Sequence, residues 1–151
     1  MTPDSLAREH LGFAPAVERN FSFLTGYGFR RTRSEPTFVR FEAAQRYLEI
    51  FHGVRSYAVG IHIGLIGEAD AEFSLPEIAY AFGERYQELA GRTKESVEAA
   101  VGKLAAQVQR YSSMLNGEMP IEGMLEYRQR LTDYYAGKSK EHPDQRYRKL
   151  P

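Results

Sequence analysis

Apolar and polar side chains alternate through most of residues 37–66, with the two-residue repeat of strands that bury one face. The repeat predicts three strands, centred on Val39–Phe41, Leu48–Ile50 and Val59–Leu65. A tight turn at Ala44-Gln45 and a loop of about four residues from Gly53 to Ser56 join them. Short connections between strands with alternating faces indicate an antiparallel meander.

The same repeat predicts the register of the sheet, because a slip of one residue would turn a strand's apolar side chains to the wrong face. With every apolar set in the core, Val39 lies opposite Ile50, and Leu48 lies opposite Ile61. The other face then carries three cross-strand rows: Phe38–Phe51–Ala58, Arg40–Glu49–Gly60 and Glu42–Tyr47–His62.

Helical spacing is present before the meander. A short opening helix precedes a second helix, which begins near Pro15 and carries an apolar stripe of Val17, Phe21 and Leu24. The segment from Phe29 to Arg33 is a further candidate strand, at the start of the sheet.

Three helices are predicted after the meander. A capping-box pattern from Ser74 to Glu77 begins the first, whose apolar stripe continues to Leu89. The second begins at Thr93. Its apolar positions repeat at steps of four and three, at Val97, Val101, Leu104, Val108, Tyr111 and Leu115. Pro120 begins the last helix, and Gly137 ends it.

These elements predict a single α+β domain over residues 1–137. Its order is an N-terminal helix, a three- to four-stranded antiparallel meander and three C-terminal helices. Residues 138–151 contain few apolar side chains, so we expect a disordered basic tail there.

Composition narrows the function classes. Twenty basic and twenty acidic residues balance, so no net charge favours nucleic acid or an anionic membrane. The chain has no cysteine, which excludes disulfides and thiolate chemistry. No apolar leader or membrane-spanning run occurs in the sequence, so we expect a cytoplasmic protein without membrane contact.

The polar sheet face is the candidate binding surface. Its residues are Phe38, Arg40, Glu42, Tyr47, Glu49 and His62. Small residues at positions 58, 60 and 64 leave room above the sheet for a ligand, a partner or a packed helix. Ordinary cross-strand pairing is the structural interpretation of the same rows.

Evidence for an enzyme is weak. No nucleophile elbow, phosphate-binding loop or dinucleotide fingerprint occurs, and no cofactor is expected. His62 beside Tyr47 and Glu42 is the candidate general base of a small hydrolase or ligand-binding enzyme. Glu49 and His52 are three positions apart on a strand, so they face opposite sides and predict no metal site.

Two further surfaces are candidates. Arg30, Arg31 and Arg33 lie close to Tyr27 and Phe29, which is a combination that can contact RNA. The neutral charge of the chain argues instead for an edge strand protected by arginines. The last helix combines tyrosines and arginines, the residue types of interface hot spots: Tyr127, Arg128, Arg130, Tyr134 and Tyr135.

The run from Phe21 to Gly64, with FSFLTGYGFRR, EPTFVRFE, YLEIFHG and SYAVGIHIG, resembles small bacterial α+β proteins of about this length. YRQRLTDYY in the last helix fits the same resemblance. Bacterial toxin-immunity proteins are similar in size and build. We therefore expect a non-enzymatic cytosolic protein-binding module whose partner is another protein, and the resemblance suggests a toxin-immunity-type protein. A small hydrolase and an RNA-associated protein are the alternatives.

Overall fold

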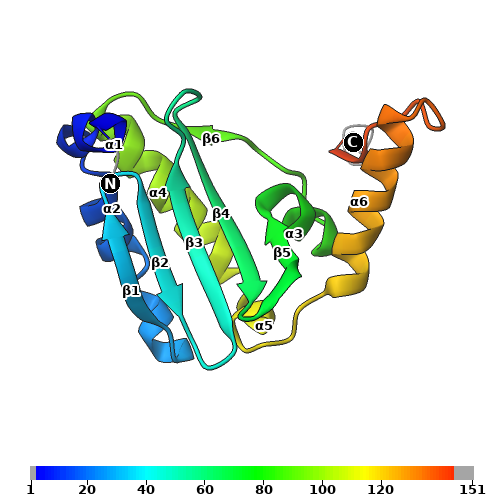
Figure 1. Cartoon of the computed structure of the whole chain (residues 1–151), viewed down its shortest axis with the longest axis horizontal. Coiled ribbons are helices and arrows are strands. Elements are labelled where there is room, and N and C mark those ends of the chain that lie inside the picture. The colour runs from blue at the N-terminus through cyan, green and yellow to red at the C-terminus, as the bar shows by residue number, and fades with distance from the viewer. Residues whose placement is uncertain (1–2, 145–151) are drawn as a thin grey trace.

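A six-stranded antiparallel sheet organises the molecule (Figure 1). The computed structural model describes residues 3–144. The strands are β1 (Arg30–Glu35), β2 (Phe38–Glu42), β3 (Arg46–His52), β4 (Ala58–Leu65), β5 (Glu68–Ser74) and β6 (Leu89–Ala90). The α-helices are α1 (Pro3–Ala7), α2 (Phe13–Asn20), α3 (Leu75–Ala81), α4 (Lys94–Gln109), α5 (Ser112–Leu115) and α6 (Ile121–Tyr135). Two 3₁₀ helices are η1 (Glu9–Leu11) and η2 (Ser22–Tyr27).

The sheet is wider than the predicted meander. Its order is β1-β2-β3-β4-β5, and β6 pairs with the start of β4. The expected three or four strands are therefore too few. β5 has the sequence EADAEFS, in which only Phe73 is a large buried apolar side chain, so its alternation is weak.

The register between β2 and β3 is as predicted, with Val39 opposite Ile50. The register between β3 and β4 is not: Leu48 lies opposite Ile63, two residues beyond the predicted Ile61. The connecting loop is longer than expected, because His52 already pairs with Val59 and Tyr57 takes a left-handed conformation with φ 56°. A shift of two residues keeps each apolar side chain on its predicted face.

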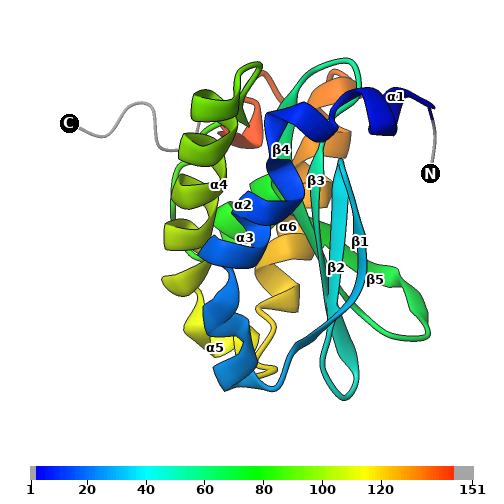
Figure 2. The same cartoon turned by 90° about the vertical axis from the view of Figure 1, so that its left-hand side faces the viewer.

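The core lies between the sheet and a helical layer on one side of it. Figure 2 shows α2, α4 and α5 along one face, while in residues 3–144 no helix covers the middle strands on the other face. The predicted stripes are buried at this interface, namely Val17, Phe21, Leu24, Val97, Val101, Leu104, Val108, Tyr111 and Leu115. Amphipathic helices therefore cover the apolar side of the sheet, as the helical spacing predicted.

The predicted helix from Ser74 to Leu89 ends early. Its capping box forms, with the Ser74 N–H donating to Glu77 Oε1 at 3.2 Å. Gly83, at φ 74°, then closes α3, and the Glu84 N–H donates to the Ala79 carbonyl at 2.8 Å. The following residues are not helical and lead into β6, and Tyr86 and Leu89 pack partly buried against the core.

Helix α6 packs on α3 beyond the β5 edge of the sheet (Figure 1). Met124 and Tyr127 are buried. Residues 138–144 of the predicted tail lie against α6: Pro143 is buried, and the Tyr127 hydroxyl donates to Asp144 Oδ1 at 3.0 Å. Residues 145–151 of that predicted tail lie outside the described residues.

Across residues 3–144, no helix has both the length and the apolar character needed to cross a membrane.

His52 is a buried histidine where the N-terminal helices meet the sheet. Its Nε2 lies 2.8 Å from the Gly91 carbonyl oxygen, which can only accept, so Nε2 carries the proton. Nδ1 is buried with no hydrogen-bond partner among the described residues. Burial is the main cause that lowers the pKa of His52 from its ordinary 6.5; the Gly91 bond opposes the shift, and the Arg8 guanidinium adds to it.

We expect stability to fall as pH decreases below 6.5, because the unfolded chain then takes up the His52 proton before the folded chain does. Above pH 6.5 the lowered pKa of His52 does not reduce the free energy of unfolding. As the pH falls from 6.5 towards the pKa of folded His52, the free energy of unfolding decreases. Chemical denaturation at about pH 8 and about pH 5.5 measures the loss. His52→Gln, which cannot titrate, should lose less between these values than the wild type. The control His10→Gln, at an exposed histidine, should behave as the wild type, and an equal loss in all three proteins would refute the assignment.

Candidate functional site on the open sheet face

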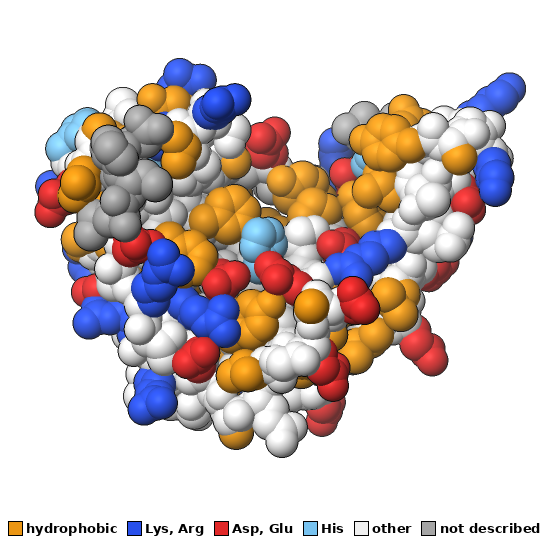
Figure 3. Space-filling model, in the orientation of Figure 1, with side chains coloured by type: hydrophobic (Ala, Val, Ile, Leu, Met, Phe, Trp, Pro, Cys, Tyr) orange, Lys and Arg blue, Asp and Glu red, His pale blue; other side chains and the backbone are white. Residues whose placement is uncertain are grey.

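The face of the sheet opposite α2 and α4 is the candidate site, and we call it the open face. Acidic, basic and hydrophobic side chains gather over its middle strands, and the surface is hollowed between the sheet and α6 (Figure 3). A separate hollow of about 400 Å³ lies beside Arg40 and Tyr47, at the turn between β4 and β5. The open face thus combines mixed chemistry with a concave shape.

All six predicted site residues lie on the open face, but in different rows. The observed rows are Phe38–Phe51–Gly60, Arg40–Glu49–His62 and Glu42–Tyr47–Gly64–Glu72. His62 therefore lies opposite Glu49, and the predicted row that placed it beside Tyr47 and Glu42 does not form. The two-residue shift between β3 and β4 is the cause.

Arg40 is the central cation of this surface. Its guanidinium donates to Glu49 Oε2 at 2.9 Å and to Glu42 Oε1 at 3.1 Å. It also lies over the Tyr47 ring, 4.1 Å from the ring centroid. The predicted Arg40–Glu49 pair thus forms, and it ties Glu42 and Tyr47 into one cluster.

Tyr47 is largely buried and hydrogen-bonds to a neighbouring side chain. The residue is only 8% exposed, and its hydroxyl donates to Glu72 Oε2 at 2.9 Å. Burial first, and then the bond to Glu72, raises the pKa of Tyr47 to about 12. The hydroxyl therefore stays protonated near neutral pH and holds one oxygen of Glu72.

The two glycines of β4 leave no empty space above the sheet. A Cβ at Gly60 would lie 2.4 Å from the Phe51 ring, and a Cβ at Gly64 would lie 2.5 Å from the Tyr47 ring. The predicted room is thus filled by aromatic rings that lie across the backbone of β4. His62 stands between these glycines, with its ring centroid 4.9 Å from that of Phe51.

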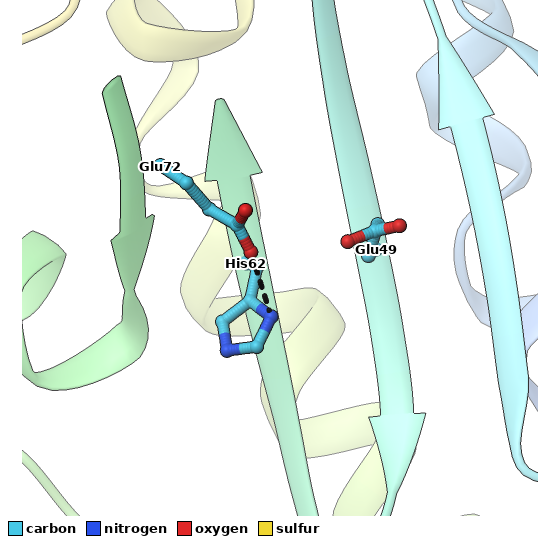
Figure 4. Close-up of side chains that lie close together, drawn as sticks. All are labelled: Glu49, His62 and Glu72. Carbon is cyan, nitrogen blue, oxygen red and sulfur yellow. Dashed lines mark ion pairs between the residues drawn. The ribbon is translucent and has the colours of Figure 1, made fainter. Parts of the chain in front are cut away.

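Glu49, His62 and Glu72 converge at the middle of the open face (Figure 4). One possible ligand atom from each lies within 4.8 Å of the others. His62 Nδ1 is 3.2 Å from Glu72 Oε1, and both side chains are 39% exposed. Sequence reasoning missed Glu72 because β5 was not predicted, although the alternation of Ala69, Ala71 and Phe73 was a weak signal for it.

Arg128 connects α6 to this region. Its guanidinium lies 4.4 Å from the Phe73 ring centroid. It also donates to the backbone carbonyls of Asp70 and Glu72 and pairs with Glu77. One predicted Tyr/Arg residue of α6 therefore braces the strand that carries Glu72.

The two other candidate surfaces are the tyrosines and arginines of α6 and the arginines of β1. The α6 residues do not form one exposed surface, and arginines of β1 are paired with glutamates. Of the α6 tyrosines, Tyr127 is buried and Tyr135 is 74% exposed. On the edge strand β1, Arg31 pairs with Glu18, while Arg33 pairs with Glu35 at 2.8 Å. These pairs favour the protected-edge interpretation over an extended basic surface for RNA.

Comparisons of the chain with protein-family models, curated proteins and solved structures found no significant match.

We expect Gly64→Ala to destabilise the fold by about 1–3 kcal/mol, because the added methyl would displace the tightly packed Tyr47 ring. Urea denaturation measures the change in the free energy of unfolding. The matched control is Gly26→Ala, since a Cβ there has no atom within 4 Å. If Gly64→Ala and Gly26→Ala are equally stable, the Tyr47 ring moves aside without a cost in free energy, and the prediction is wrong.

Proposed function

We propose that this chain is a non-enzymatic protein-binding module that contacts its partner through the open face. The observation that carries the proposal is the asymmetry of the sheet: helices cover one face, while the other presents charged and aromatic side chains. Mixed aromatic and arginine surfaces are typical of protein interfaces.

The charges of the open face favour a partner with a defined orientation. Arg33 lies opposite Arg40 across β1 and β2 and shares its face, and each of these arginines pairs with a glutamate of its own strand, whereas Glu49 and Glu72 lie on β3 and β5. A partner with a basic group over Glu49 and Glu72 and an acidic group that reaches the exposed Arg33 would match this arrangement. The charges would therefore determine the orientation of the partner as well as its position on the open face.

Apolar side chains on α6 extend the proposed surface. Ile121 and Leu125 are exposed, and Tyr135 is more exposed still. Their spacing places them on the side of α6 that carries Arg128, which reaches towards β5. A partner seated on the open face would thus be in reach of a second, more apolar contact.

The finer proposal is an immunity-type protein that binds and neutralises a bacterial toxin in the cytoplasm. It is supported by the small α+β build and by the absence of catalytic sequence motifs. A toxin gene next to the gene for this chain would provide the partner for the binding test.

Capture from a lysate of the native host tests the binding surface. We expect Arg33→Glu to reduce recovery of the partner by about tenfold or more, as at an interfacial hot spot. The matched control is Arg19→Glu on the helical side: the two arginines are 59% and 60% exposed, and each forms one surface ion pair.

Quantitative mass spectrometry of the captured proteins gives the ratio between the variants. Recovery that is unchanged by Arg33→Glu, or reduced equally by both substitutions, would contradict use of the open face. Circular dichroism verifies that each variant is folded.

A small ligand-binding or hydrolytic enzyme is the second candidate. The observation that favours it is the convergence of two carboxylates and an imidazole on one partly exposed spot. The residues differ from the predicted Glu42, Tyr47 and His62, because the register between β3 and β4 places His62 opposite Glu49, and β5 brings Glu72 beside it. Hydrolysis of a small ester or phosphoester that is lost in His62→Ala would favour this candidate over the binding module.

A further inference from the structure

Glu49, His62 and Glu72 have the composition of a metal-binding site. One imidazole nitrogen and two carboxylate oxygens are ligands of Zn²⁺ and related divalent ions. The three side chains come from β3, β4 and β5, so the sheet itself sets their spacing (Figure 4). We propose that these three residues bind a divalent transition-metal ion, with Zn²⁺ as the best match.

The distances suit a single ion. Ligand atoms around one tetrahedral Zn²⁺ lie about 3.4 Å apart, given bonds of about 2.0–2.2 Å. His62 Nδ1 and Glu72 Oε1 are 3.2 Å apart, and the whole set lies within 4.8 Å. The largest separation would have to shrink by about 1.4 Å at most, which a rotation of a glutamate side chain can supply.

Groups outside the trio orient both carboxylates. Arg40 Nη1 donates to Glu49 Oε2 at 2.9 Å, and the Tyr47 hydroxyl donates to Glu72 Oε2, also at 2.9 Å. Each carboxylate therefore has one oxygen held from outside the trio, and the other oxygen of Glu72 faces His62 Nδ1. Metal-ligating carboxylates in proteins are commonly held in this way by an outer layer of donors.

The charge of the cluster also favours a dication. Glu42 and Glu49 accept hydrogen bonds from the Arg40 guanidinium, and Glu72 accepts one from Tyr47, whose ring lies beneath that guanidinium. With a neutral imidazole, the three carboxylates and the guanidinium leave two negative charges in excess. A divalent ion would neutralise them.

The surroundings leave places for further ligands. His62 and Glu72 are 39% exposed, so water or a group from a bound molecule can complete the coordination. The Phe51 and Tyr47 rings that cover Gly60 and Gly64 flank His62 on its strand. The imidazole argues for Zn²⁺, Co²⁺ or Ni²⁺ over Mg²⁺ and Ca²⁺, which prefer oxygen ligands alone.

Isothermal titration of the untagged, chelator-treated full chain with ZnCl₂ tests the proposal. We expect one ion per chain, a rise in melting temperature with Zn²⁺ and none with the same concentration of MgCl₂. Loss of an outer-layer partner typically weakens metal binding about 10–100-fold, so His62→Ala should weaken it more than about 100-fold. Tyr47→Phe, which keeps the ring over Gly64 but loses the bond to Glu72, should weaken it by about tenfold.

His10→Ala is the matched control, because it removes an exposed histidine far from the trio in sequence. Its Zn²⁺ affinity should equal that of the wild type. Glu72→Gln provides a second ligand variant if His62→Ala does not fold. The visible spectrum of bound Co²⁺ reports coordination directly and should change in both ligand variants.

Two results would overturn the site: absence of Zn²⁺ binding by the wild type, or equal binding by the His62→Ala, Glu72→Gln and His10→Ala proteins. The metal site does not depend on the proposed partner. A chain that fails the Zn²⁺ titration but shows Arg33-dependent capture would remain a binding module, and the reverse result would leave the metal site in place.

Discussion

The arrangement of the open face depends on one constraint, the alternation of apolar and polar side chains along β2, β3 and β4. Each strand places its apolar side chains beneath the helical layer, where Val39, Leu48 and Ile63 are buried. Every intervening side chain must then point the other way. Polar groups from successive strands are thereby concentrated on one surface, as a geometric consequence of core formation.

That concentration is sharpened by the glycines of β4. Phe51 and Tyr47 lie on the same face of β3, on either side of Glu49, and their rings lie across Gly60 and Gly64. The rings gain contact with the β4 backbone, and His62 is confined between them. The same packing buries the Tyr47 hydroxyl next to Glu72, where it donates a hydrogen bond. Aromatic packing and the position of the carboxylate are therefore coupled, so a change at Gly64 would alter both.

Much of the fold could be predicted because its signals are local. The turn at Ala44-Gln45 forces the β2–β3 register, and the stripe of α4 is long and regular. Three features could not be predicted in this way. The β3–β4 loop depends on Tyr57 in a left-handed conformation, which the residue type does not indicate. Gly83 ends α3 within a continuing apolar stripe, and β5 has too few large apolar residues to produce a clear repeat.

These errors affect the site in different ways, which explains what the sequence could say about it. A register shift of two residues preserves the face of each side chain, so all six predicted residues stay on the open face. The same shift changes every neighbour across the β3–β4 pair, so His62 meets Glu49 in place of Tyr47. Chemistry depends on neighbours rather than on faces, because an ion or a proton is shared only over hydrogen-bonding distances. The contact that gives this surface its metal-binding composition, His62 with Glu72, also requires β5. Periodicity alone could therefore locate the surface. Only the pairing of β4 with β5 brings His62 and Glu72 close enough to share an ion or a proton.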